Sequence, residues 1–313
     1  MDGEWARRVT WGQVMTATVV DRPAIATLED APLPDRESYS SLTMYESCPR
    51  RYAFRYVEHL PGHVPPGRFA FGSAIHRAFE VYVRVRIRAH AEGTEQPGLA
   101  TLREACDEVL DRAGLEPGEL ARMQAAAGPV LARFVAREAT LGTMPIAVEL
   151  GFGVDVALPD GQGSIRFVGY LDRVDRASDG STVICDYKTG RTRAQAEVDA
   201  DRQLTAYAYA ASRGALRDPA SGAPLPSASQ LSLYFADDGT EVTTTRTSAE
   251  LAAFESDLVA MATAARERRF DPRPESWRCH WCEYRDSCAD AIGDERRAAQ
   301  PSAVAGPDLA ARG

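Results

Sequence analysis

The sequence predicts one α/β domain in which helices flank a central run of strands. The first observation is a change of period, because apolar residues recur at helical spacing in the first half of the chain and then alternate, as they do in strands. The second is the return of helical spacing later in the chain. Hydrophobic residues make up 44% of the 313 residues, which is enough for a substantial core.

The chain begins with a segment that has no clear period. Residues 1–37 contain three prolines and are predicted to form an irregular N-terminal extension. A hydroxyl-rich run at 38–43 then suits the start of a helix, and Thr43 with Glu46 fits a capping box. We expect this helix to run to about Tyr56, distorted at Pro49.

Three further helices are predicted before the strands. The first spans 72–91, with Ile75, Phe79 and Tyr82 on one face. Residues 101–140 form the other two, broken near a glycine and a proline in the middle of that segment.

The strands and later helices follow from alternation and turn signals. Asp-Gly pairs separate three strands, and a Pro/Gly/Ser-rich insert at 213–229 precedes a fourth. The strands are predicted at 147–156, 164–173, 182–187 and 230–235. Helices are predicted at 193–212 and 248–268, and an Ala/Pro/Gly/Arg-rich tail at 292–313 is predicted to be disordered. The folded domain is therefore expected at 38–291.

Composition limits the compartment and the partners. No apolar stretch approaches the roughly 20 residues that span a bilayer, and no apolar segment follows the N-terminus as in a secretory signal. We therefore expect a cytoplasmic protein without a membrane partner, in which cysteines serve metals or catalysis more often than disulfides. The net charge of −9 argues weakly against a nucleic-acid partner, but a local basic stripe can override that average.

Two acidic residues stand at the ends of neighbouring strands. Asp172 interrupts an apolar strand, where an unpaired carboxylate is costly to bury. Asp186 ends the next strand 14 residues later, so a hairpin can bring the two side by side. Two such carboxylates repel each other unless a cation lies between them, and their hard oxygens favour Mg²⁺ or Mn²⁺.

Lys188 is the only lysine among 36 basic residues; the other 35 are arginine. It follows Asp186 by two residues and so lies on the same side of the strand. A compact ammonium beside a metal ion suits phosphodiester hydrolysis, because both can stabilise the charge that develops at phosphorus.

These residues resemble a known family. Gly-x-x-Asp at Asp172, followed by Asp-Tyr-Lys at Asp186, resembles motifs II and III of the PD-(D/E)XK nucleases, and specifically of their RecB-like exonuclease branch. The segment that ends in His76 resembles the helix with the metal-binding histidine of that branch. Gln203 and Tyr207 resemble its Gln-x-x-x-Tyr motif, with both side chains on one helical face.

The resemblance implies a restriction-endonuclease-like core, which is a central mixed sheet flanked by helices. It also implies that Asp172, Asp186, His76 and the backbone carbonyl of Tyr187 bind the metal ion. Lys188 would be the catalytic lysine. Gln203 and Tyr207 would contact or orient the DNA. Taken alone, His76 and the Gln203/Tyr207 pair are ordinary helix residues, and Glu80 and Glu149 can be read as metal-site neighbours or as solvated acids.

Four of the six cysteines form a second pattern. Cys279, Cys282 and Cys288 have metal-ligand-like spacing, and a local fourth ligand is missing except for His280, whose position is awkward. The context of Cys48 resembles that of the first cysteine in AddB-type and CRISPR-associated RecB-like nucleases. That resemblance implies a 4Fe-4S cluster that joins N- and C-terminal segments; zinc in the same thiolates is the competing interpretation.

The remaining two cysteines, Cys106 and Cys185, fall inside an expected helix and strand. They are predicted to be buried, unligated thiols.

The predicted function is a metal-dependent DNA nuclease. Exonuclease action on single-stranded or end-bearing DNA, in repair, recombination or related processing, is what the resemblance implies. Two alternatives are a non-catalytic DNA-end-binding module and a zinc-stabilised DNA-binding scaffold. A phosphate-binding P-loop needs a lysine of its own, so any helicase motor would belong to a separate partner protein.

Overall fold

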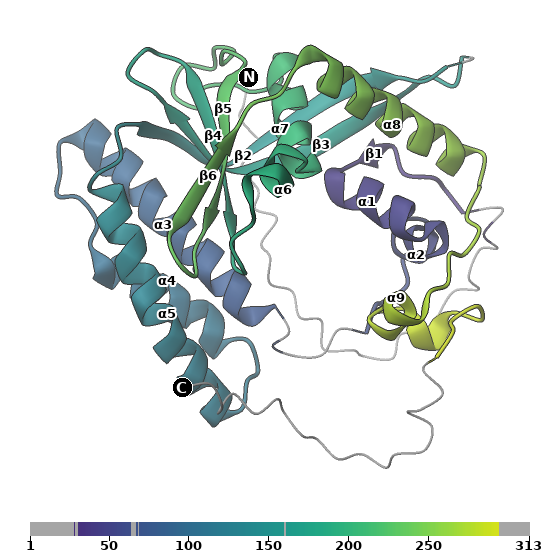
Figure 1. The fold of residues 1–313 in the computed structure, drawn as a ribbon, viewed down its shortest axis with the longest axis horizontal. Coiled ribbons are helices and arrows are strands. Elements are labelled where there is room, and N and C mark those ends of the chain that lie inside the picture. The colour runs from purple at the N-terminus through teal and green to yellow at the C-terminus, as the bar shows by residue number, and fades with distance from the viewer. Residues whose placement is uncertain (1–27, 29–30, 64–66, 68, 160, 294–313) are drawn as a thin grey trace, which may run out of the picture.

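The computed structural model describes residues 28, 31–63, 67, 69–159 and 161–293. The predicted tail at 292–313 and the predicted extension at 1–37 therefore lie mostly outside the described residues. Within these, six strands form one mixed sheet with helices on both faces (Figure 1), as expected of an α/β domain.

The sheet contains β1 (Arg36–Glu37), β2 (Met144–Ala157), β3 (Ser164–Arg176), β4 (Thr182–Lys188), β5 (Ala228–Phe235) and β6 (Thr240–Thr244). The long strand β3 pairs with β2 and with β4, both antiparallel, and with β1 in parallel. β5 runs parallel to β4 and antiparallel to β6. β2 is an edge strand, so one side of the β2–β3 hairpin is not paired with other strands.

The helices are α1 (Tyr39–Ser47), α2 (Pro49–Tyr52), a π-helical turn (Ala53–Val57), α3 (Ala70–Glu92), α4 (Leu99–Asp111), α5 (Pro117–Glu138), α6 (Gln195–Asp199), α7 (Arg202–Ser212), α8 (Ser248–Arg266) and α9 (Ser276–His280), followed by a 3₁₀ turn (Arg285–Ser287). α3, α4 and α5 pack side by side on one side of the molecule, and α8 lies across the sheet on the other (Figure 1).

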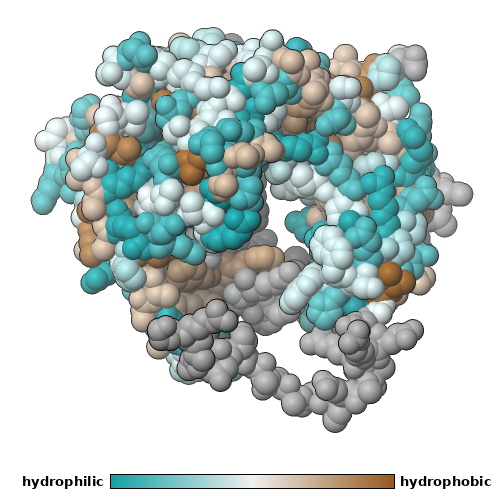
Figure 2. Space-filling view, viewed as in Figure 1, coloured by the Kyte–Doolittle hydropathy of each residue, from teal (hydrophilic) through white to brown (hydrophobic). Residues whose placement is uncertain are grey.

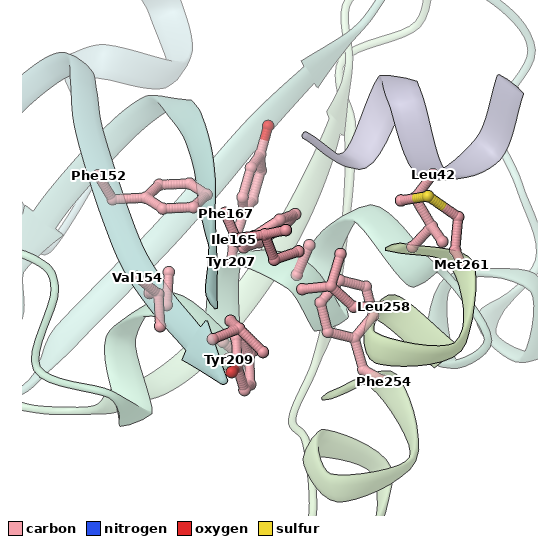
Figure 3. Packing of buried hydrophobic residues seen from close by; sticks show 14 of the residues in the cluster. Leu42, Phe152, Val154, Ile165, Phe167, Tyr207, Tyr209, Phe254, Leu258 and Met261 are labelled. Atoms are coloured by element: carbon pink, nitrogen blue, oxygen red, sulfur yellow. The ribbon is translucent and has the colours of Figure 1, made fainter. Parts of the chain in front are cut away.

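Two hydrophobic cores lie on opposite faces of the sheet, because alternate residues of each strand point to opposite faces. In β4, Ile184 belongs to the core under α1, α7 and α8. Figure 3 shows that core, where Phe152 and Phe167 from the β2–β3 hairpin meet Tyr209 of α7 and Phe254 of α8. The next β4 residue, Cys185, belongs to the core under α3, α4 and α5.

The first helix differs from the expectation at two points. Ser38 caps the first helix, accepting from Ser41 N, so the capping box predicted at Thr43 and Glu46 is wrong. The helix expected to reach Tyr56 is interrupted at Cys48, whose backbone is extended because the following Pro49 disfavours a helical conformation there. The break leaves the Cys48 side chain between two helices.

The predicted extension also contains structure. Arg36 and Glu37 pair with β3, where irregular chain was expected, because a strand of two residues is too short to show a period.

The helix expected at 193–212 is also interrupted, and a second strand, β6, was not predicted. Asp201 starts α7 by accepting from Leu204 N at 2.9 Å, which separates α7 from the short α6. The β6 segment consists mainly of exposed and half-buried polar residues on the edge of the sheet, so it has little apolar alternation to detect.

The space-filling view shows a hollow between the part of the molecule that contains α3–α5 and the part that contains α1, α2 and α9 (Figure 2). Among the described residues, no helix has the length and apolar character required to cross a membrane.

Candidate active site

The β3–β4 hairpin brings the two acidic residues together. Arg173 pairs with Cys185 in the antiparallel register, so Asp172 and Asp186 lie next to each other just beyond that pair. The strands diverge there, and the backbone N–H of Tyr187 donates to Asp172 Oδ2 at 2.9 Å. The register of one hairpin therefore positions both carboxylates and the Tyr187 backbone.

The two carboxylates have no room for full hydration. Asp186 is 1% exposed, and burial together with the charge of Asp186 raises the pKa of Asp172 well above its usual range. A cation between them would remove both penalties.

Lys188 extends from β4 on the same side as Asp186. Its Nζ lies 2.6 Å from Asp186 Oδ2 and 2.7 Å from Gln203 Oε1 on α7. Gln203 Nε2 donates to the Tyr207 hydroxyl at 2.8 Å, and that hydroxyl donates to Asp186 Oδ1 at 3.1 Å. Asp186, Lys188, Gln203 and Tyr207 thus form a closed ring of contacts, called the β4–α7 ring below.

The β4–α7 ring places Gln203 and Tyr207 next to the acidic residues of the candidate site. Tyr207 is 4% exposed, with its hydroxyl on Asp186, and Gln203 lines the cavity beside Lys188. Burial, followed by the charge of Asp186, raises the pKa of the Tyr207 hydroxyl, which keeps it protonated and able to donate. Direct contact of these two residues with DNA stays a prediction.

His76 reaches the same place from α3. Its Nδ1 lies 3.4 Å from Asp172 Oδ2, and burial lowers its pKa, so the imidazole is neutral at pH 7, the form that binds metals. Gly72 allows this approach of α3 because a Cβ there would lie 3.0 Å from Thr189 Oγ1 on the loop after β4.

The donors fit a hard divalent cation, although their arrangement is not that of a loaded site. Within the part of the chain that the structure describes, no three His, Cys, Asp or Glu side chains surround a common point closely enough to hold a metal ion. The Lys188 ammonium instead lies against Asp186, whose Oδ2 is buried and has no hydrogen bond of good geometry. The oxygens of two carboxylates and a backbone carbonyl are nonetheless the ligand types that Mg²⁺ and Mn²⁺ prefer, and a neutral imidazole is a common metal ligand.

The residues enclose a cavity of about 410 Å³ at the carboxyl end of β4. Besides the two acids, His76, Lys188 and Gln203, its lining includes Arg191 and Arg193 from the loop before α6. Both arginines are paired, Arg191 with Glu197 and Arg193 with Asp201. The cavity therefore places two arginines near the two carboxylates.

Glu149, which the sequence allowed to be either a metal-site neighbour or a solvated acid, lies beside the candidate site. It lies between Val148 and Leu150, whose partners on β3 flank Asp172, so it is opposite Asp172 across the hairpin. Its φ of 49° is a strained backbone conformation for a glutamate. Burial, followed by the charge of Glu80, raises its pKa to about 7. Only the strand register could have revealed this position.

Glu149→Gln is expected to stabilise the metal-free protein at alkaline pH. The raised pKa means that the protonated carboxyl is favoured in the folded state, so this contribution to stability is present below the usual pKa and is lost as pH rises through about 7. In EDTA, the variant should therefore melt higher than wild type at about pH 8, and this advantage should vanish toward about pH 5. Glu104→Gln, at an exposed position on α4, is the control. A melting difference that is the same at both pH values would contradict the burial of Glu149.

The four cysteines of the second pattern lie together. Cys48, Cys279, Cys282 and Cys288 line one small cavity of about 30 Å³, and all four are free thiols. Burial is the main cause that raises the pKa values of Cys282 and Cys288. Within the described residues, the four thiols do not lie close enough around one point to hold a metal ion.

The contacts around this cavity hold the N- and C-terminal segments against each other. Arg51 Nε and Nη2 donate to Glu283 at 2.9 and 3.0 Å. His280 packs its ring against Trp281, with ring centroids 4.8 Å apart, and does not line the thiol cavity.

The other two cysteines lie elsewhere. Cys106 and Cys185 are 1% and 3% exposed, so both thiols are buried as expected.

Comparison with protein-family models decides the family. A model described as the PD-(D/E)XK nuclease superfamily matches residues 36–289. The chain belongs to the PD-(D/E)XK nuclease superfamily. The match extends over the sheet, the acidic hairpin and all four clustered cysteines of this PD-(D/E)XK protein. The mixed sheet with helices on both faces fits the core of that superfamily.

Other comparisons are less informative. The chain is similar to the solved structure entitled "Crystal structure of SSO0001", with 14% sequence identity and a TM-score of 0.35, over 72% of this chain and 96% of that one. No protein with a curated description matches the sequence significantly.

Proposed function

We propose that this PD-(D/E)XK protein is a metal-dependent nuclease that hydrolyses phosphodiester bonds in DNA at the cavity around Asp172 and Asp186. The observation that carries the proposal is the β4–α7 ring, because it places one ammonium against the carboxylate of Asp186 and beside a second, nearly buried carboxylate. Placing several charged groups together in a partly buried site costs folding stability, and such arrangements are typical of functional sites.

Asp172, Asp186, His76 and the carbonyl of Tyr187 would hold a divalent cation, which supplies Lewis-acid polarisation of the phosphate when bound. The protein residues do the rest. Lys188 is the cationic donor next to the phosphate, where it stabilises negative charge on the non-bridging oxygens. Gln203 accepts from Lys188 Nζ and so fixes its direction.

Two other groups would support this chemistry. Tyr207 holds Asp186 Oδ1 by donating to it, which leaves Oδ2 for the cation and Lys188. Arg191 and Arg193 line the cavity and can bind the phosphates next to the cleaved one.

Exonuclease action on single-stranded or end-bearing DNA is proposed from the order of the motifs, which is that of the RecB-like branch. His76 comes first, then Asp172, then Asp186 with Lys188, and finally the Gln203/Tyr207 pair. A role in DNA repair, recombination or related processing, with a separate helicase as partner, belongs to the same proposal.

Asp186→Asn tests the site with two readouts. We expect the variant to lose Mn²⁺ binding in calorimetry and to lose cleavage of linear single- and double-stranded DNA, because it removes one of two anionic ligands. Glu104→Gln on α4 should behave as wild type in both assays. Mn²⁺ binding and cleavage that persist in Asp186→Asn would contradict the proposed site.

We further propose that Cys48, Cys279, Cys282 and Cys288 hold a 4Fe-4S cluster that fastens the N- and C-terminal segments together. The support is the shared small cavity and the sequence context of Cys48. Protein purified without oxygen is expected to contain iron and sulfide and to be brown, and Cys279→Ser should lose both. Cys106→Ser is the matched control, since that thiol is buried elsewhere. Zinc without iron would assign the thiols to zinc and would favour the zinc-stabilised scaffold if cleavage were also absent.

A further inference from the structure

Tyr170 is an exposed aromatic residue on the strand that carries Asp172. Its side chain is 58% exposed, and it precedes Asp172 by two residues on β3. Residues two apart on a strand lie about 7 Å from each other along the chain. The tyrosine is therefore an immediate neighbour of the proposed site, although it does not line the 410 Å³ cavity.

Two glycines on β2 lie directly beside the Tyr170 and Arg166 side chains of β3. A Cβ on Gly151 would meet the Tyr170 ring at 3.1 Å, and a Cβ on Gly153 would meet the Arg166 guanidinium at 2.7 Å. Larger side chains there would displace both groups. Gly151 and Gly153 therefore allow the Tyr170 and Arg166 side chains to lie against β2.

Both side chains line a groove of about 700 Å³, called the hairpin groove below. The basic residues that line it are Arg36, Arg166, Arg213 and Arg217, and Asp155 is the one acidic residue in the lining. Asp155 accepts from Arg166 Nη1 at 3.0 and 3.2 Å. Arg213 also has a carboxylate partner, Glu255, at 3.6 Å. The groove is thus net basic on a chain whose net charge is −9.

We propose that the hairpin groove binds the single-stranded DNA that adjoins the cleaved phosphate, with one base stacked on Tyr170 and the backbone phosphates near the arginines. This inference rests on the proposed nuclease function, and it names the form of the substrate. An aromatic ring in a basic groove is the combination that binds single strands without regard to sequence. A base within a duplex is already stacked and cannot use the ring, so the groove selects an unpaired strand.

Binding in EDTA separates this inference from the question of cleavage. Anisotropy of a labelled oligothymidylate should show Tyr170→Ala binding roughly 5- to 150-fold more weakly than wild type, the range for loss of one stacked base. Tyr170→Phe keeps the ring and should stay within about twofold. Unchanged affinity of Tyr170→Ala, or no binding by wild type, would overturn the inference.

A pair of arginine variants tests the electrostatic part. Arg166 and Arg112 are both exposed and each pairs with one carboxylate, but Arg112 is the C-cap of α4 and does not line the groove. Arg166→Ala should weaken binding and reduce its dependence on salt, while Arg112→Ala should change neither. Equal effects of the two variants would contradict a local binding groove.

Cleavage and crosslinking complete the test. With Mn²⁺, Tyr170→Ala should lose more activity on single-stranded than on blunt double-stranded DNA; an equal loss on both would indicate damage to the hairpin and would contradict the stacking role. Oligonucleotides that contain iododeoxyuridine should crosslink to Tyr170 on irradiation. If wild type cleaves DNA but no crosslink maps to Tyr170, the inference fails and the proposed function stands. If wild type binds DNA with an affinity that depends on Tyr170 but never cleaves it, the proposed nuclease function fails and the binding groove stands.

Discussion

Lys188→Arg is expected to lose cleavage by about 100-fold or more, the typical cost of removing one preorganised charge-stabilising donor. Lys188 Nζ fits between Asp186 and Gln203 at 2.6 and 2.7 Å, and the side chain is 24% exposed. The planar guanidinium is larger and donates in a fixed fork, so it cannot occupy the place of a compact ammonium without moving a partner.

Initial rates on end-labelled DNA at saturating Mn²⁺ measure this effect. Lys188→Ala should be as inactive as Lys188→Arg, and both should keep the wild-type melting temperature within a few degrees. Arg112→Lys, the reverse exchange at the exposed C-cap of α4, serves as the control. Activity of Lys188→Arg near that of wild type would show that only positive charge is required, and the assignment of a positioned ammonium would fall.

Arg173→Ala is expected to destabilise the protein by about 3–5 kcal/mol, because it removes the buried guanidinium that pairs with the buried carboxylates of Asp175 and Glu138. Arg173 is completely buried, donates to Asp175 at 2.6 and 3.0 Å, and also pairs with Glu138 of α5. Glu138 is 1% exposed and would keep only Arg86 and Arg137.

Urea denaturation of the metal-free protein tests this prediction. Arg166→Ala is the matched control, since it removes an exposed ion pair from the same strand and should cost at most about 1 kcal/mol. If the two variants were equally stable, the buried network would not be a main support of β3. Because Arg173 directly follows Asp172, its loss should also lower Mn²⁺ affinity at urea concentrations where the fold persists.

The sequence predicted four of the six strands well because these strands carry clear physical signals. The alternation in 147–156, 164–173 and 182–187, with Asp-Gly turns between, specified β2, β3 and β4 to within a few residues. The long amphipathic helix expected at 72–91 matches α3, which brings His76 to Asp172. The site follows from these elements, since the antiparallel register fixes which residues are neighbours.

What the sequence could not predict depends on tertiary contacts. Glu149 looks like any polar residue on a strand, and only its position opposite Asp172 makes it part of the site. Arg173 reads as an exposed charge until α5 supplies Glu138 as its partner. Tyr170 gains its role from Gly151 on the neighbouring strand, a relation that no local pattern encodes.

The most direct test of the proposed catalytic site is cleavage of end-labelled linear DNA by purified wild type, with Mn²⁺ and with EDTA, beside Lys188→Ala. Wild type should release labelled products in Mn²⁺ and none in EDTA, and Lys188→Ala should release none in either. Binding of DNA without cleavage by wild type would favour a non-catalytic end-binding protein, and equal cleavage by both proteins would contradict the role assigned to the single lysine of this chain.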